Sequence, residues 1–149
     1  MLHAVSLLLA LLSTAAGANP ALRPDGLVFD AVVAADGNIS APLYLTRRGE
    51  YFAELLLERD AAGRRPAELP FAGAVRVLRH DEPVFTRGFS TELGADQPTA
   101  TLFRITTDRE LPLKTPLTLV LDGATTPPAG ATLRLQLRLK PNPGPYFLR

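Results

Sequence analysis

The sequence predicts an all-β domain: an antiparallel β-sandwich of about eight strands, either immunoglobulin-like or jelly-roll-like. Three observations predict it. Short segments alternate apolar and polar residues, which is the period of a strand with one buried face. Fourteen prolines and eleven glycines separate these segments at roughly even spacing. The 149 residues are 46% hydrophobic and 21% charged, the composition of one ordinary globular domain.

The start of the chain has the pattern of a secretory signal peptide. Residues 1–18 carry no Asp, Glu, Lys or Arg, and Val5–Leu12 is an apolar run broken only by Ser6. Small residues, Ala16-Gly17-Ala18, follow it as they do at a cleavage site. The run is shorter than the roughly 20 apolar residues that span a bilayer. We therefore expect an exported bacterial protein, periplasmic or secreted, with no transmembrane segment in its mature chain.

Charge and cysteine content remove several classes of function. The chain has no cysteine, which excludes disulfides, thiol nucleophiles and zinc–thiolate sites. The net charge is +1, and the pairs Arg47-Arg48 and Arg64-Arg65 are isolated next to carboxylates instead of forming a basic surface. We expect no nucleic-acid partner, because such binding depends on cations that neutralise several phosphates.

The first strands of the domain are predicted from alternation and turn residues. Residues 19–26 contain two prolines and predict an extended segment before a domain over 27–140. The first strand is expected over Leu27–Val33, and Asp36-Gly37-Asn38 predicts the turn that ends it. The second is expected over Ile39–Thr46, where Pro42 indicates an edge strand or a bulge.

Residues 51–58 are expected to form the central strand of the sandwich. Alternate residues share one apolar face, and they are Tyr51, Ala53, Leu55 and Leu57. Since Arg48-Gly49 precedes this run as a turn, we expect a first hairpin from Leu43 to Glu58.

The second half of the domain follows the same pattern. Glycine and proline predict a loop over 60–70, and polar residues predict another over 91–98. Further strands are predicted over 73–79, 84–89, 99–107, 117–121 and 133–139. The first two of these are expected to form a hairpin, and the third to place Thr101, Phe103 and Ile105 together on one side. Residues 141–149, with three alternating prolines, predict a stiff C-terminal tail.

Two groups of residues are candidates for binding. Tyr44, Phe52 and Leu56 are expected on the partly polar face of the first hairpin, as an exposed apolar patch or one covered by a helix or loop. Tyr146 and Phe147 end the proline-rich tail and offer aromatic side chains to a partner. Sheet edges could also receive a partner, by strand addition.

The turn His80-Asp81-Glu82 is the one place where catalytic or metal chemistry is considered. We expect a solvated hairpin turn. The alternative is a metal site of one imidazole and two carboxylates, or a Ser-His-Asp site that uses Ser40 or Ser90. Glu54 and Glu58 are roughly 13 Å apart along a strand, too wide for a catalytic carboxylate pair. We predict no catalytic residue and no cofactor.

Parts of the sequence resemble a family of small exported bacterial proteins that is catalogued only as a domain of unknown function. The resemblance is in Gly49-Glu50-Tyr51-Phe52-Ala53-Glu54-Leu55, in Leu69-Pro70-Phe71 before Val75 and Val77, and in Arg104-Ile105 with Leu113. It covers residues 40–140 and departs at Thr115-Pro116-Leu117, where the family has a Gly-x-Tyr turn. The resemblance implies a β-sandwich and export, and assigns no functional residue.

Taken together, these patterns predict a non-enzymatic exported binding module that inhibits or accompanies a protein partner in the cell envelope, with a small ligand as an open alternative. A small hydrolase or metal-binding enzyme centred on His80-Asp81-Glu82 is the second hypothesis. A structural envelope protein that self-associates through an edge strand is the third.

Overall fold

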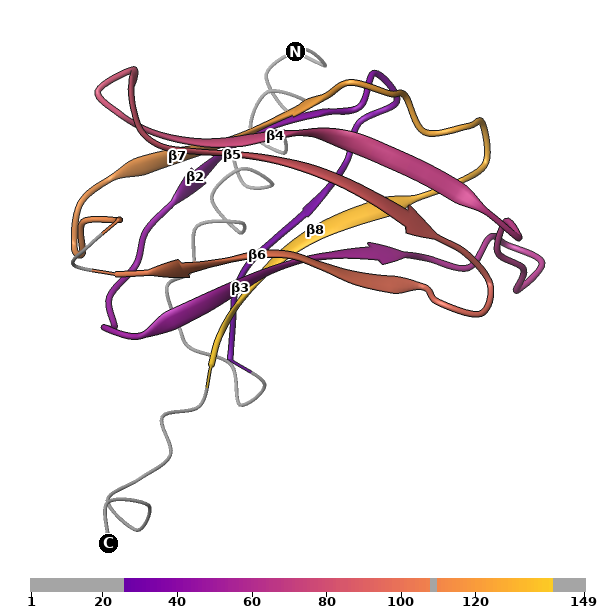
Figure 1. The fold of residues 1–149 in the computed structure, drawn as a ribbon, viewed down its shortest axis with the longest axis horizontal. Helices are drawn as coiled ribbons and strands as arrows, with labels where there is room; N and C mark the ends of the chain where they lie inside the picture. Colours follow the sequence, from indigo (N-terminus) through magenta and orange to yellow (C-terminus); the bar gives the residue numbers. More distant parts are fainter. Residues whose placement is uncertain (1–25, 108–109, 141–149) are drawn as a thin grey trace, which may run out of the picture.

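The computed structural model describes residues 26–107 and 110–140, which form two four-stranded antiparallel sheets packed face to face (Figure 1). One sheet has the order β1-β8-β3-β6 and the other β2-β7-β4-β5. The strands are β1 Leu27–Val32, β2 Asn38–Leu43, β3 Glu50–Leu57, β4 Leu69–Arg79, β5 Glu82–Leu93, β6 Thr99–Thr106, β7 Leu117–Gly123 and β8 Leu133–Leu139. The expected all-β sandwich is confirmed. Over these two ranges the chain has no helix that is both long and apolar enough to cross a membrane.

The strands pair in a nested order. The first pairs with the last, the second with the seventh, the third with the sixth and the fourth with the fifth. Every pair of successive strands except β4 and β5 therefore lies in opposite sheets. In an immunoglobulin constant-type sandwich the first two strands are neighbours in one sheet, so the order found here is a different one.

The alternation read from the sequence places the core correctly. Tyr51, Ala53, Leu55 and Leu57 of β3 are each at most 3% exposed, and β3 lies between β8 and β6 as a central strand. Leucines of β8 flank these residues in the same sheet, and leucines of β7 face them from the other sheet. Both strands show the same alternation of buried residues. Burial of one such leucine side chain contributes about 1.5–3 kcal/mol, so these strands supply much of the stability of the sandwich.

The predicted first hairpin is wrong. β2 pairs with β7, whereas β3 pairs with β6 and β8 in the other sheet. The segment between them, residues 44–49, crosses from one sheet to the other and places Leu45 in the core at 1% exposure. The buried side chain of Leu45 stabilises this crossing. Because the segment joins two sheets, it is not the tight turn of a hairpin. Pro42 does lie in an edge strand, as expected.

The second hairpin is confirmed and is longer than predicted. β4 begins at Leu69, inside the expected loop, and pairs there with Leu93 at the end of β5. Pro70 is tolerated because β4 pairs with β7 only over Gly73–Leu78, so one edge of the strand is open before that point. A proline, which has no N–H to donate, fits at such an edge.

A bulge in β6 changes the predicted inward face of that strand. Phe103 pairs with Ala53 and Thr101 pairs with Glu54, which leaves Leu102 as an extra residue between them. Phe103 and Ile105 are buried on one side as expected, but Thr101 does not share that side: it is exposed because the bulge reverses the alternation.

Candidate functional site

The three residues predicted to form an apolar patch do not come together. Tyr44 follows β2 in one sheet and is 44% exposed. Phe52 and Leu56 lie on the outer face of β3 in the other sheet and are partly buried. Since the outer faces of two packed sheets point in opposite directions, Tyr44 belongs to a different surface.

Phe52 is covered by cations from the neighbouring strands. The Arg104 guanidinium lies 5.1 Å and the Lys140 ammonium 6.0 Å from the centroid of its ring. Both cations also pair with Glu50, at 3.4 Å and 3.7 Å. The expected covering of this residue therefore comes from cation–π contacts of long side chains and not from a helix or a loop.

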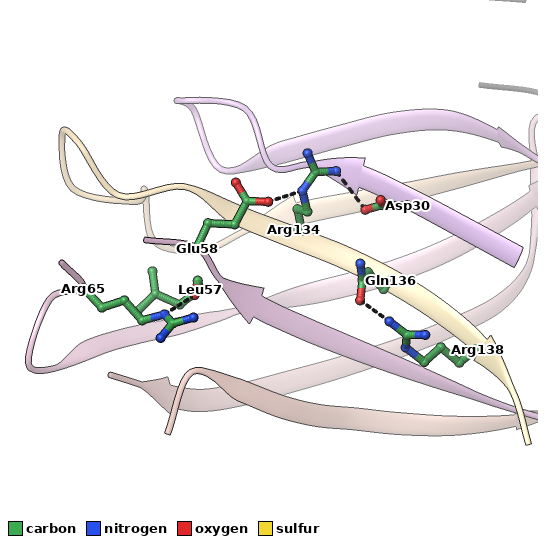
Figure 2. Close-up of polar contacts among 7 residues, drawn as sticks. All are labelled: Asp30, Leu57, Glu58, Arg65, Arg134, Gln136 and Arg138. Atoms are coloured by element: carbon green, nitrogen blue, oxygen red, sulfur yellow. Dashed lines mark hydrogen bonds and ion pairs between the residues drawn. The ribbon is translucent and has the colours of Figure 1, made fainter. Parts of the chain in front are cut away.

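Ion pairs occupy the rest of this outer face. Figure 2 shows Arg134 of β8 between Glu58 and Asp30, with its Nη1 3.0 Å from the Asp30 carboxylate. Hydrogen bonds to Glu58 and then to Asp30 raise the pKa of Arg134. Arg138 pairs with Glu54 at 3.4 Å. Glu54 and Glu58 are thus partners of arginines, and this face stabilises the sheet.

The turn at His80 is confirmed as a hairpin turn. Arg79 pairs with Glu82, and the two residues between them have positive φ, 50° at His80 and 64° at Asp81. Positive φ at both central residues is the type I′ geometry that joins twisted antiparallel strands. His80, Asp81 and Glu82 are exposed.

The described residues do not support the alternatives considered for this turn. They contain no group of three or more His, Asp or Glu side chains arranged to hold a metal ion. Ser90 of β5 pairs with Ala72, eight residues before His80 along the hairpin, and is therefore roughly 25 Å from the turn. Ser40 of β2 pairs with Val120, which pairs with Arg76, so Ser40 lies two strand spacings, about 10 Å, from Arg76 and farther from His80. Neither serine lies next to His80.

Some predictions lie outside the described residues. The signal peptide over residues 1–18 and the tail over 141–149 are among them, and with the tail its two aromatic candidates, Tyr146 and Phe147. They remain predictions.

The structure presents a different candidate site, a cleft of about 730 Å³ at one end of the sandwich. Three connections meet at this end, to the left in Figure 1: β2 to β3, β4 to β5, and β6 to β7. Three cations line the cleft: Arg48 and Lys114 lie on two of these connections, and Arg79 ends β4 next to the third. We call this site the end cleft.

Apolar side chains line the end cleft beside the cations. Val84 is 39% exposed at the start of β5, whereas Leu111 is 1% exposed and belongs to the core. Leu113 is partly buried and packs against that core. The end cleft therefore combines apolar contact area with positive charge, a combination suited to binding.

Hydrogen bonds fix the β2–β3 connection that carries Arg48. The Lys114 N–H donates to the Leu45 carbonyl at 2.8 Å, which joins this connection to the one between β6 and β7. The Tyr51 hydroxyl donates to the Arg47 carbonyl at 2.7 Å. Burial raises the pKa of Tyr51, and the hydrogen bond and charge of Arg47 oppose this effect.

Thr107 holds the same connection at its other end. It is 4% exposed, and its Oγ1 accepts from the Gly49 N–H at 2.8 Å and donates to the Gly49 carbonyl at 3.1 Å. The Thr107 N–H donates to the same carbonyl at 3.1 Å. Gly49 has a φ of 148°, which favours glycine, and a Cβ there would lie 2.8 Å from Leu139 Cδ1.

In the described lining of the end cleft, cationic side chains outnumber carboxylates. Glu110 is its one described carboxylate, and this side chain pairs with Arg87 at 3.8 Å and accepts from the Thr106 N–H at 2.9 Å. Among the residues that the structure describes, Arg79 and Lys114 are exposed and have no ion-pair partner. Two cations are thus available to a bound anion.

No family model matches this chain, and no curated protein does. The expected resemblance to a domain of unknown function is therefore neither supported nor contradicted.

Sequence reasoning missed the end cleft because its cations are far apart in the chain. Thirty residues lie between Arg48 and Arg79, and 34 lie between Arg79 and Lys114. One signal was present: Arg48 is part of one predicted turn, and Arg79 directly precedes another. The meeting of these turns at one end follows from the nested strand order, which the sequence did not predict.

Proposed function

We propose that this chain is an exported jelly-roll module that binds a protein partner and catalyses no reaction. The first strand pairs with the last and each inner strand with its counterpart, as in a long hairpin rolled into two sheets, which is the jelly-roll arrangement. The signal-peptide pattern of residues 1–18 and the resemblance to exported proteins support the exported location.

The observation that carries this proposal is the end cleft. Connections at the end of a β-sandwich are held by a rigid scaffold, and binding residues are commonly found there. Here the strand ends and connections at this end supply cations and apolar area, and five hydrogen bonds, from Lys114, Tyr51, Gly49 and Thr107, fix the connection that carries Arg48. The cations and apolar side chains of the end cleft can bind and orient a partner. None of the residues named here is a nucleophile paired with a base.

Affinity capture tests the proposal. The processed protein is used as bait on periplasmic and membrane fractions of its own organism, with chemical cross-linking, and the captured proteins are identified by mass spectrometry. We expect one stoichiometric partner that also captures this chain in the reciprocal experiment.

Three results would contradict the proposal. Capture of further copies of this chain alone would favour the self-associating envelope protein. A hydrolytic activity abolished by His80→Ala would favour the enzyme. Retention in the cytoplasm with residues 1–18 intact would contradict export.

A further inference from the structure

We infer that the end cleft binds an extended acidic segment of a protein, with carboxylates next to Arg79 and Lys114 and apolar side chains against Val84 and Leu113. This inference rests on the proposed function and specifies the chemistry of the segment that the module recognises. Its argument has four steps: charge, size, the neighbouring aromatic residue and rigidity.

Charge complementarity selects an acidic ligand. Three cationic side chains line the end cleft, and the carboxylate of Glu110 is already engaged with Arg87 and the Thr106 N–H. A ligand carboxylate near Arg79 or Lys114 gains attraction without displacing an internal ion pair in the described part of the chain. Such complementarity mainly supplies specificity and a fast association rate.

The size of the end cleft selects an extended ligand over a small anion. Its volume of about 730 Å³ is within the range of roughly 300–1,000 Å³ typical of ligand sites. Inorganic phosphate would fill a small part of this volume and would leave the apolar side chains of Val84 and Leu113 uncovered. A segment that carries both acidic and apolar side chains uses both parts of the lining.

Tyr44 offers additional contact area to a ligand that is part of a protein. It is 44% exposed and lies two residues before Thr46, which lines the end cleft. Tyrosine is enriched at protein interfaces, where its ring adds contact area and its hydroxyl accepts or donates a hydrogen bond. A peptide that leaves the end cleft along the β2–β3 connection would contact this ring, whereas a small anion would not.

Rigidity makes the site suitable for a flexible ligand. The β2–β3 connection is held through Leu45, Arg47 and Gly49. Because this connection is already held in place, binding loses little backbone freedom there, and the ordering of the peptide accounts for most of the entropic cost.

Peptide binding to the purified protein, as processed by its expression host, tests the inference. The probe is a fluorescein-labelled ten-residue peptide of alternating glutamate and leucine, compared with the glutamine–leucine peptide of the same length. Fluorescence anisotropy gives the dissociation constants. We expect the acidic peptide to bind, the neutral one to bind at least roughly tenfold more weakly, and added salt to weaken the acidic peptide.

Variants place the binding in the end cleft. Lys114→Gln and Arg79→Gln each remove one unpaired cation, and we expect each to raise the dissociation constant of the acidic peptide roughly fivefold. Arg64→Gln is the control, since it removes the same charge from an exposed side chain on the β3–β4 connection, which does not line the end cleft. Tyr44→Ala should weaken binding of the acidic peptide. It should leave unchanged the affinity for inorganic phosphate, measured by displacement of the peptide. Circular dichroism and thermal midpoints establish that each variant is folded.

The outcomes separate this inference from the proposed function. An equal loss in Arg64→Gln and Lys114→Gln would mean that net charge alone attracts the peptide, and this would overturn the inference. Phosphate that binds as tightly as the peptide would also overturn it, because the site would then be one for small anions. If a protein partner is captured and neither Lys114→Gln nor Arg79→Gln weakens it, the binding function stands and the end cleft is not its site.

Discussion

Replacement of Thr107 by valine tests whether the Gly49 clamp fixes the connection that carries Arg48. Valine keeps the β-branched shape and removes the hydroxyl, so both of its hydrogen bonds with Gly49 are lost. The Gly49 carbonyl keeps the Thr107 N–H as a donor at 3.1 Å, whereas the Gly49 N–H loses the acceptor that lay at 2.8 Å. The perturbation is therefore one unsatisfied donor in a partly buried site.

The cost of that donor gives the expected magnitude. An unsatisfied buried polar group costs about 1–3 kcal/mol, and the partial burial here favours the lower half of this range, about 1–2 kcal/mol. Each 1 kcal/mol lowers the thermal midpoint of a domain of about 100 residues by roughly 4–8 °C. We expect Thr107→Val to lower the free energy of unfolding by about 1–2 kcal/mol and to weaken binding in the end cleft.

Urea unfolding followed by far-ultraviolet circular dichroism measures the difference. Thr106→Val is the matched control, because the same substitution one residue earlier in β6 changes an exposed side chain. It should remain within about 0.5 kcal/mol of the wild type. Equal stability of the two variants would refute the reasoning, since the hydroxyl of Thr107 would then contribute nothing to the fold.

Three further predictions concern other parts of the sandwich. Tyr51→Phe removes a hydrogen bond and should destabilise the protein by about 1 kcal/mol at neutral pH. Burial raises the folded-state pKa of Tyr51 above its ordinary 10.0, so the hydroxyl of Tyr51 stabilises the folded protein below pH 10.0 and loses this effect as the pH rises above it. The difference in free energy of unfolding between the wild type and Tyr51→Phe, measured in urea, should therefore narrow above pH 10.0. A difference that stays constant would contradict this. Arg134→Met removes two ion pairs whose side chains are about one-third exposed, and we expect the free energy of unfolding to fall by about 1 kcal/mol. This loss should shrink in about 1 M sodium chloride, because salt screens ion pairs. A loss that does not depend on salt would assign the effect to packing. The double substitution His80→Asn and Asp81→Gly suits the two positive φ angles and should raise the thermal midpoint by the equivalent of about 0.5–1 kcal/mol, whereas a lower midpoint would contradict the type I′ assignment.

Much of the fold could be predicted because alternation reports burial directly. The leucines at positions 133, 135 and 137 and the apolar face of β3 identify strands without any knowledge of their partners. The β4–β5 hairpin was predictable for a local reason: two turn residues join its strands. Its full length was not, because Pro70 becomes acceptable only where β7 stops pairing with β4.

Strand pairing between distant segments could not be predicted. Leu43 and Leu45 continue one alternation, and the sequence gives no sign that the chain changes sheets between Leu45 and Glu50. The extra residue Leu102 was equally hidden, because a bulge becomes visible only against the partner strand. The end cleft depends on both kinds of information, and so none of its cations was a candidate from the sequence.

The pairing of β1 with β8 also determines when the domain can be completed as the ribosome makes it. β4 and β5 can pair as soon as Leu93 has emerged, because two residues separate the strands. β3 must wait for β6, and β1 gains its neighbour only when residues 133–139 have been synthesised. Until then the growing chain exposes unpaired strand edges, the condition in which nascent β proteins aggregate and chaperones bind. Translation of the last strand is thus the step that closes the first sheet.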